Sequence, residues 1–197
     1  MNLLVLTGIF PPNVGGPATY VPRISSELQQ AGWNIEVLTA GKETASRSFP
    51  YPVHRISSSK LYRFRESQTF FQKRKNWADC IYVNGLEIDH YLAGSPGPSV
   101  EKIVGDRSWE RYRNNEKGSL EIKEFQHRAP WILPRLEQKL QYRITQSNDR
   151  IIVPSNFLKN IVRQWGINEE KIHVIYNTDH PPQTIPPPLL KIFGVLH

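Results

Sequence analysis

Short apolar runs and helical repeats alternate along this chain, and together they predict its strands and helices. Residues 3–6 form an apolar run, and a loop rich in glycine and proline follows it. Apolar residues then recur at helical spacing, at Val21, Ile24, Leu28 and Ala31. Thr19 is a suitable N-cap for this helix, and Gly32 is a suitable stop. The beginning of the chain therefore predicts a strand, a glycine loop and a helix.

The same alternation continues to about residue 176. Further strands are predicted over residues 34–39, 53–56, 79–84, 100–104, 150–154 and 171–176. Apolar residues four apart predict a long helix with Ile132, Leu136, Leu140 and Ile144. After Ser155, a suitable N-cap, another helix carries Leu158, Ile161, Val162 and Trp165 on one face. Because several strands are apolar on both faces, we expect an α/β fold: a Rossmann-like three-layer sandwich with a mostly parallel sheet.

Size and composition narrow the class of protein. The chain has 197 residues, 39% of them hydrophobic, which is enough for one core. We expect one domain over residues 1–180 and a proline-rich tail over residues 181–197. The single Cys80 excludes a disulfide framework, and the six scattered histidines have no metal-ligand spacing, so no metal is expected. No apolar run reaches the roughly 20 residues needed to cross a bilayer, so any membrane contact is expected to be peripheral.

A net charge of +7 favours anionic partners. Residues 60–75 combine six basic side chains with interleaved aromatic and apolar ones, and they predict a helix. Two interpretations stay open: the aromatics lie in the core with the cations in water, or the helix lies on an anionic membrane surface. A nucleic-acid partner is not expected, because no RRM, KH or zinc-finger pattern accompanies the charge.

The glycine loop is the first candidate for ligand binding. In an open α/β sheet this turn lies at the carboxyl end of a strand, and the helix that follows offers N–H groups and a positive dipole end to an anion. Gly15 and Gly16 leave room for a ligand beside the main chain. Neither the dinucleotide nor the P-loop fingerprint is present, so phosphate or a sugar hydroxyl is the expected ligand. The alternative is that the glycine pair serves only to allow positive φ.

A second candidate region begins at Asp106, directly after the strand predicted over residues 100–104. Arg107, Trp109 and Glu110 follow it and are side chains that bind polar ligands. The alternative for Asp106 is a helix N-cap, a position where aspartate is favoured. For Trp109 the alternative is packing.

Four ordered motifs carry a resemblance to a known family. They are Thr7–Pro12 with Gly15–Tyr20, Lys102–Glu110, Val153–Leu158 and Lys171–Asn177. Together they resemble the N-terminal domain of the family 4 glycosyltransferases, retaining enzymes of the GT-B fold in which two Rossmann-like domains face each other. The resemblance covers residues 1 to about 180.

The resemblance implies roles for individual residues. Gly15 and Gly16 would donate backbone N–H groups to the diphosphate of the sugar donor as negative charge grows on the leaving nucleotide. Asp106 would be catalytic, although Gly105 stands where many members of the family carry a histidine. The substrate-binding candidates are Thr19, Tyr20, Asn84, Arg107, Trp109 and Glu110.

The resemblance also implies a function and partners. The chain would be the acceptor-side domain of an enzyme that transfers a sugar from a nucleotide-sugar donor, a substrate and not a cofactor, to a glycan or lipid-linked acceptor. A C-terminal donor-binding domain, which carries a Glu-x7-Glu motif in the family, would complete it as a separate polypeptide. The expected location is the cytoplasm, at the inner face of the membrane. The alternatives are a catalytically inactive remnant that binds the acceptor or an anionic ligand, and an NAD(P)-dependent Rossmann oxidoreductase.

Overall fold

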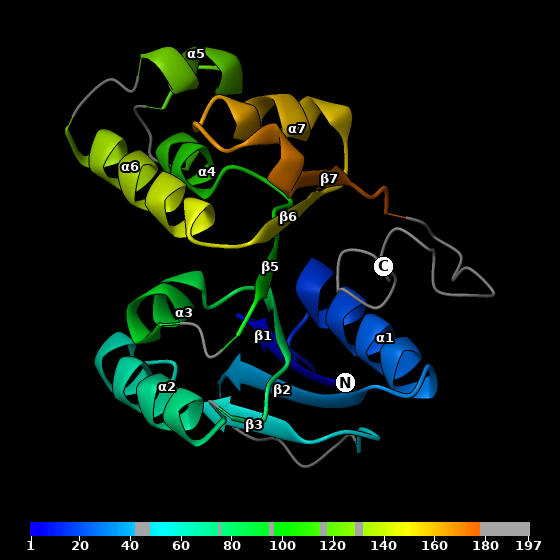
Figure 1. The fold of residues 1–197 in the computed structure, drawn as a ribbon. Helices are drawn as coiled ribbons and strands as arrows, with labels where there is room; N and C mark the ends of the chain where they lie inside the picture. Colours follow the sequence, from blue (N-terminus) through cyan, green and yellow to red (C-terminus); the bar gives the residue numbers. More distant parts are fainter. Residues whose placement is uncertain (42–47, 75, 95–96, 115–117, 129–131, 178–197) are drawn as a thin grey trace. The chain divides into compact units, whose positions relative to one another are not determined.

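The chain forms a seven-stranded parallel sheet with helices, in the strand order β3-β2-β1-β4-β5-β6-β7 (Figure 1). This computed structural model describes all residues except 42–47, 75, 95–96, 115–117, 129–131 and 178–197. The strands are β1 Asn2–Thr7, β2 Asn34–Ala40, β3 Val53–Ile56, β4 Cys80–Asn84, β5 Ser99–Lys102, β6 Arg150–Val153 and β7 Ile172–Val174. Every described strand pairing is parallel. The predicted Rossmann-like α/β fold is confirmed.

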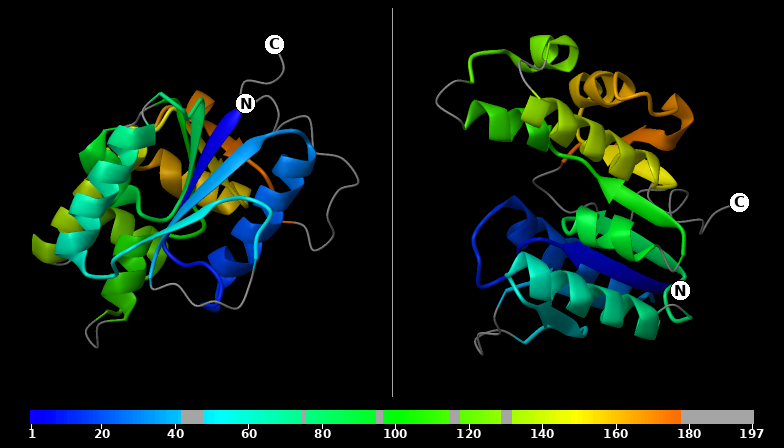
Figure 2. Two further views of the ribbon diagram at one scale, coloured as in Figure 1. Left: turned by 90° about the horizontal axis from the view of Figure 1, so that it is seen from below. Right: turned by 90° about the vertical axis from the view of Figure 1, so that its left-hand side faces the viewer.

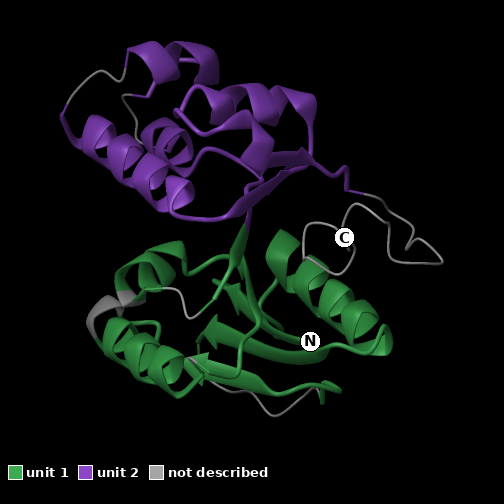
Figure 3. Ribbon diagram, viewed as in Figure 1, with its two compact units in different colours: residues 1–100, 180–197 green, residues 101–179 purple. Residues whose placement is uncertain are grey.

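The chain divides into two compact units, which Figure 3 shows in separate colours. Unit 1 comprises residues 1–100 together with residues 180–197, and the latter lie outside the described residues. Unit 2 comprises residues 101–179. The boundary falls inside β5. The predicted single domain over residues 1–180 stays a prediction, and the predicted tail over residues 181–197 lies outside the described residues.

Unit 1 places helices on both faces of its strands. Its helices are α1 Gly16–Gln30, α2 Lys60–Arg74 and α3 Glu87–Ala93. On one face, Leu4, Leu6 and Val83 pack in a buried cluster with Phe71 of α2. On the other face, α1 brings Tyr20 against Tyr82 of β4. The views in Figure 2 show α1 on the side of the strands away from α2 and α3.

The order of the strands reverses at β1. From β1 the chain passes through α1 to β2 and then β3, all on one side of β1, and it later returns to β4 on the other side. In open parallel sheets, ligands bind beyond the carboxyl ends of the strands at such a reversal. The carboxyl ends of β1 and β4 therefore mark the first place to look for a site.

Helix α1 begins earlier than the apolar pattern predicted. Its N-cap is Gly15, and Thr19 lies in the first turn, where its hydroxyl donates to the Gly15 carbonyl at 3.3 Å. The prediction of Thr19 as N-cap was therefore wrong. Pro17 is compatible with the first turn because the missing N–H would have no partner there, so the helix can start four residues sooner than predicted. The predicted stop is confirmed, since Gly32 follows the last turn with φ of +89°.

The basic segment predicted to be helical forms α2 over Lys60–Arg74, and residue 75 lies outside the described residues. Phe71 is buried and Phe70 is half-buried, whereas Tyr62 is 63% exposed. Two of the helix's arginines are paired, Arg63 with Asp89 and Arg74 with Glu36. Phe71 thus follows the first interpretation and packs in the core, whereas Tyr62 faces solvent.

Unit 2 contains four helices and a 3₁₀ turn in its described part. They are α4 Arg107–Arg113, α5 Ile122–His127, α6 Ile132–Gln146, α7 Asn156–Arg163 and the 3₁₀ turn Glu169–Lys171. The Ser155 side chain accepts a hydrogen bond from the Leu158 N–H, so the predicted cap of α7 is confirmed. The face predicted for this helix is buried as well: Leu158, Ile161, Val162 and Trp165.

The orientation of α6 differs from the orientation that its apolar residues predict. Ile132 is 75% exposed, Leu136 is 56% exposed and Leu140 is 43% exposed, and only Ile144 of the predicted row is buried. The buried positions include two glutamines, Gln138 and Gln141. The helix turns its polar side inward because unit 2 has a polar network in its interior, described below.

Three other elements of the structure differ from what the sequence predicted. Helices α3 and α5 lie in segments for which the apolar pattern predicted no helix. Strand β7 is shorter than predicted at both ends, and at its start Lys171 belongs to a 3₁₀ turn capped by Asn168. Among the residues that the structure describes, no helix is long and apolar enough to cross a membrane.

Candidate functional site

Three polar side chains form a row at the carboxyl end of the unit 1 strands. In the parallel register, Thr7 of β1 pairs with Thr39 of β2 on one side and with Asn84 of β4 on the other. All three are buried, with exposures of 0%, 0% and 8%. Because Tyr82 lies two residues before Asn84 and contacts α1, the row lies on the α1 face of the sheet. A polar row in an otherwise apolar core is the kind of position at which a ligand replaces water.

The loop after β1 is held in place by buried and hydrogen-bonded residues. Phe10 is fully buried, and the Thr7 hydroxyl donates to the Ile9 carbonyl at 2.8 Å. The Arg55 guanidinium of β3 donates to the Pro11 carbonyl. At Gly85, directly after Asn84, the backbone passes so close to Gly8 that any side chain would collide with it. These contacts fix the conformation of the loop that follows Thr7 of the polar row.

The two glycines of this loop differ in what they require. Gly15 has φ of +153°, and a Cβ there would lie 2.7 Å from the Ile9 Cδ1, so glycine is needed for the backbone itself. At Gly16 a Cβ would meet no atom within 4 Å. The requirement for φ > 0 therefore accounts for Gly15, and Gly16 borders open space.

Helix α1 begins at this open space without a side-chain cap. Gly15 is the N-cap, and no side chain accepts a hydrogen bond from the first turn. The Thr19 N–H already donates to the Gly15 carbonyl, and Pro17 has no N–H, so the N–H groups of Gly16 and Ala18 are the first-turn donors that face outward. This end of the helix also carries the positive end of its dipole.

The remaining unit 1 candidates lie on either side of this helix start. Thr19 is exposed. Tyr20 is half-buried against the sheet: burial raises its pKa, and a hydrogen bond with the Tyr82 hydroxyl lowers it part of the way back. Gly15, Gly16, Thr19, Tyr20 and Asn84 are thus gathered around the carboxyl ends of β1 and β4 in unit 1.

Asp106 is the centre of the polar network inside unit 2. Its side chain is fully buried and caps α4, accepting hydrogen bonds from the Ser108 and Trp109 N–H groups at 3.0 Å each and from the Ser108 hydroxyl at 2.6 Å. Gln126 of α5 and Gln141 of α6 donate to it as well. The N-cap interpretation is confirmed. The catalytic role of Asp106 stays a prediction.

The Asp106 network explains the inward-facing polar side of α6. Gln141 donates its Nε2 to Asp106 and accepts the Ser108 N–H on its Oε1 at 3.0 Å. The Gln126 Oε1 in turn accepts from the Tyr142 hydroxyl and the Trp165 indole, at 2.9 and 3.0 Å. One buried carboxylate thereby links α4, α5, α6 and the end of α7.

The other unit 2 candidates surround the start of α4. Trp109 packs against the Tyr112 and Phe125 cluster and donates its indole N–H to the Leu120 carbonyl, so the packing alternative is confirmed for it. Glu110 is an exposed residue with a partly buried carboxyl group. This partial burial and the negative charge of Asp106 raise the pKa of Glu110, and the positive charge of Arg107 lowers it part of the way back. A side chain at Gly105 would collide with the Glu110 carboxylate. Substrate binding by Arg107, Trp109 and Glu110 stays a prediction.

Sequence reasoning missed three polar residues. Thr7 is the last residue of β1 and Thr39 is the last but one of β2, and each follows a leucine, a repeat that was visible in the sequence. The third is Lys102 at the end of β5, whose Nζ donates to the Asn177 Oδ1 at 2.9 Å. Burial lowers the pKa of Lys102 to about 8. No apolar pattern predicts a buried lysine, so its position could be found only in the structure.

Solved structures share this fold at low sequence identity. HepE of Anabaena, solved with UDP and glucose, matches with a TM-score of 0.55 and 16% identity over 90% of this chain and 44% of that chain. Sucrose-phosphate synthase of Thermosynechococcus elongatus matches with a TM-score of 0.58 and 14% identity over 89% of this chain and 47% of that one. The lipopolysaccharide outer core galactosyltransferase WaaB matches with a TM-score of 0.54 and 11% identity, over 90% and 46%.

The chain spans about half the length of these three proteins. No curated protein sequence matches it significantly. The profile of Glycosyltransferase Family 4, however, matches residues 14–178, which include the glycine pair, most of the polar row and the Asp106 network. The match covers most of the chain, and the chain belongs to Glycosyltransferase Family 4.

Proposed function

We propose that this chain is the acceptor-side half of a retaining glycosyltransferase. It transfers a sugar from a nucleotide-sugar donor to a glycan or lipid-linked acceptor once a C-terminal donor-binding domain completes it. The observation that carries the proposal is the uncapped start of α1 beside the buried row of Thr39, Thr7 and Asn84, at the reversal of strand order. A structural relative, HepE, was solved with UDP-glucose, which supports a nucleotide sugar as the donor.

In this proposal the start of α1 stabilises the leaving group. Cleavage of the bond between sugar and diphosphate leaves negative charge on the diphosphate. The N–H groups of Gly16 and Ala18 donate to it, and the helix dipole adds a favourable potential. Gly16 matters because any side chain there would occupy the space that the diphosphate needs.

In unit 2, Asp106 acts as a positioning residue. Its carboxylate already accepts five hydrogen bonds and is fully buried, so it fixes the turn between β5 and α4. This turn presents Arg107 and Glu110 toward solvent, and these two side chains bind the hydroxyl groups of the acceptor. The raised pKa of Glu110 makes its carboxylate a stronger hydrogen-bond acceptor, which suits a polyhydroxy ligand.

Helix α6 is the surface that meets an anionic membrane. Ile132, Leu136 and Leu140 form an exposed row along it, and Leu133 is 69% exposed beside them. An exposed row of basic residues with the same four-residue spacing runs next to it: Arg135, Lys139 and Arg143. Apolar and basic rows side by side are typical of helices that lie in the interface of anionic bilayers. This surface replaces residues 60–75 as the proposed contact.

Vesicle co-sedimentation tests the membrane contact. The chain is expected to bind vesicles of phosphatidylcholine and phosphatidylserine and to bind pure phosphatidylcholine much less. The double change Ile132→Ser and Leu136→Ser should abolish this binding, whereas Tyr62→Ser, an exposed residue of α2, should not affect it. Binding that does not depend on phosphatidylserine, or that is lost with Tyr62→Ser, would contradict the proposal.

Nucleotide release tests the transfer reaction. The chain joined to a family 4 donor-binding domain is expected to release nucleotide from its sugar donor in the presence of acceptor. Gly16→Val should abolish release without changing the circular dichroism spectrum, because a Cβ at this position meets nothing in the fold. Gln30→Val, an exposed position at the other end of α1, is the matched control and should retain full activity. A Gly16→Val enzyme with normal activity would refute the role of the loop.

A further inference from the structure

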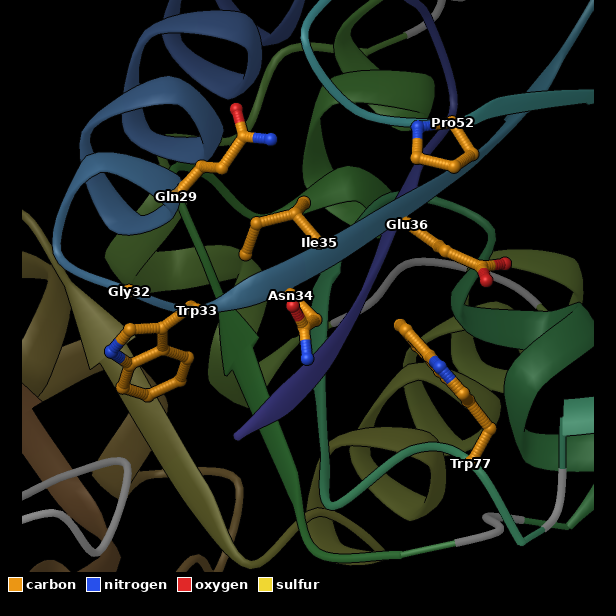
Figure 4. Close-up of a pocket in the computed structure, with 8 residues that line it drawn as sticks. All are labelled: Gln29, Gly32, Trp33, Asn34, Ile35, Glu36, Pro52 and Trp77. Carbon is orange, nitrogen blue, oxygen red and sulfur yellow. The ribbon is translucent and has the colours of Figure 1, made fainter.

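A pocket with a cavity volume of about 350 Å³ lies at the amino end of β2 in unit 1 (Figure 4). Its polar side chains are already bonded within the protein: Gln29 to the Pro50 carbonyl, Asn34 to Asn2, and Glu36 to Arg74. The pocket also lies at the opposite end of the strands from the candidate site. The carboxyl ends of the unit 2 strands differ from it, because exposed side chains there keep polar atoms available to a ligand.

Three neighbouring strands end side by side in unit 2. The Ile103 N–H, just after β5, donates to the Ile152 carbonyl of β6. The Ile175 N–H, just after β7, donates to the Val153 carbonyl at the end of β6. Strand β6 thus lies between β5 and β7. Neighbouring strands are about 4.8 Å apart, so the ends of β5 and β7 are about 10 Å apart.

Each of these strands is followed by side chains that suit a polar ligand. After β5 come Arg107 and Glu110, which the proposed function assigns to the acceptor. After β6 comes Asn156, the first residue of α7, which is exposed. After β7 comes Tyr176, which is 60% exposed. Because the strands are parallel, all of these residues follow the same edge of the sheet, the edge at which open α/β sheets bind ligands.

Tyr176 is exposed and yet held in position. Its hydroxyl accepts a hydrogen bond from the Asn156 Nδ2 at 3.2 Å. The residues on either side of it are fixed as well: the Ile175 N–H is bonded to β6, and the Asn177 Oδ1 accepts from the Lys102 Nζ at 2.9 Å. An aromatic ring already held in one orientation loses little conformational entropy when a ligand packs on it.

Two amide groups next to Tyr176 each keep one atom available. The Asn156 Oδ1 and the Asn177 Nδ2 have no hydrogen-bond partner within the described part of the chain. The first is an acceptor and the second is a donor, and both residues are exposed, so a ligand can reach them from solvent. Sugar hydroxyls both donate and accept, and the C–H face of a sugar ring can pack on an aromatic ring. The surroundings of Tyr176 therefore suit a sugar.

We propose that this edge of unit 2 binds two linked sugar rings, so that the acceptor is a glycan of at least two sugars. The first ring bonds to Arg107 and Glu110 after β5. The second ring packs on Tyr176 after β7, and its hydroxyls bond to the amides of Asn156 and Asn177. A single ring is shorter than the separation of about 10 Å between these strand ends, whereas two linked rings cover it. The inference rests on the proposed function, which supplies the place of the first ring.

NMR of the full chain tests this second sugar position, with methyl β-cellobioside and methyl β-D-glucopyranoside as probes. The disaccharide is expected to shift the Tyr176 ring and Asn156 side-chain resonances saturably and to bind about tenfold more tightly than the monosaccharide. Tyr176→Leu should reduce the affinity for the disaccharide to that for the monosaccharide and leave the latter unchanged. Tyr62→Leu, which replaces a tyrosine of α2 that is 63% exposed, is the matched control and should change neither.

A second variant separates packing on the ring from the hydrogen bond to Asn156. Tyr176→Phe keeps the ring and loses only a solvent-exposed hydrogen bond, so its affinity for the disaccharide should fall by less than about threefold. The thermal unfolding temperature of Tyr176→Leu should stay unchanged, because the side chain is exposed.

The proposal is overturned if the two sugars bind equally tightly, if Tyr176→Leu binds the disaccharide normally, or if Tyr176→Phe loses as much affinity as Tyr176→Leu. Uridine that shifts the Tyr176 ring at lower concentration than the disaccharide would overturn it as well. Equal affinities with shifts at the Arg107 and Glu110 amides would contradict only the second sugar position. No response to either sugar at these two amides would also contradict the acceptor role in the proposed function.

Discussion

At the residue scale, the start of α1 depends on two neighbouring glycines that differ in their surroundings. Gly15 occupies a backbone conformation that other residues avoid, and its missing side chain makes room for Ile9. Gly16 has an ordinary φ and faces empty space. Gly15 is therefore required by the backbone conformation, whereas Gly16 leaves space in which a ligand can bind.

This difference predicts opposite effects on stability. Gly15→Ala should lower the free energy of unfolding by about 1–3 kcal/mol, because a Cβ strains this backbone and meets the Ile9 side chain. Gly16→Ala should leave it unchanged or raise it by about 0.4–1 kcal/mol through the smaller entropy of the unfolded chain. Urea unfolding of both variants measures the two values. Equal losses would mean that Gly16 is needed for the fold after all.

Lys102 predicts how stability changes with pH. Its pKa is lowered to about 8 by burial, below the 10.5 of the unfolded chain, so between these values the unfolded chain binds more protons than the folded one. The free energy of unfolding should therefore rise as the pH increases from about 8 toward 10. Above that range the half-buried Tyr20 and the buried Tyr82, whose pKa values are raised, oppose the rise.

Lys102→Met isolates this contribution. The variant keeps the length of the side chain and has no proton to lose, so its thermal unfolding temperature should change less between pH 8 and pH 10 than that of the natural sequence. Identical pH profiles for the two proteins would show that the Lys102 ammonium group is not desolvated in the fold.

At the element scale, α6 inverts the usual arrangement of a surface helix. Its leucines and Ile132 face outward, and Gln138 and Gln141 face the interior. The interior side is polar because Asp106 needs donors for a fully buried carboxylate, and an unsatisfied buried acceptor costs more than an exposed leucine. The exposed row then becomes available for the proposed membrane contact.

This arrangement predicts that a more apolar residue destabilises α6. Gln141→Leu removes the donor to Asp106 and the acceptor of the Ser108 N–H, so it should lower the free energy of unfolding by about 1–3 kcal/mol. Leu136→Ser on the exposed side should change it by less than about 0.5 kcal/mol. Chemical unfolding of both variants compares them. A destabilised Leu136→Ser protein would indicate that this row is buried in solution.

At the scale of the whole molecule, the sequence predicted the α/β fold and most strands, because short apolar runs between glycine and proline turns are typical of buried strands. The bounds of β3 were found as predicted, and β1 and β2 each proved one or two residues longer. The burial of α6 was mispredicted, since hydrophobic spacing cannot reveal a partner such as the Asp106 carboxylate. The row of Thr39, Thr7 and Asn84 depends on the register of three strands, which no local pattern encodes.

The most direct test of the central claim is whether the start of α1 binds a diphosphate. Pyrophosphate, the group common to nucleoside-diphosphate sugars, can be titrated into the chain while the amide resonances are followed by NMR. The Gly16 and Ala18 amides are predicted to shift together and saturably, to do so equally in Gln30→Val, and to stop responding in Gly16→Val. Amides at Gly16 and Ala18 that stay unchanged at saturating pyrophosphate would contradict the account.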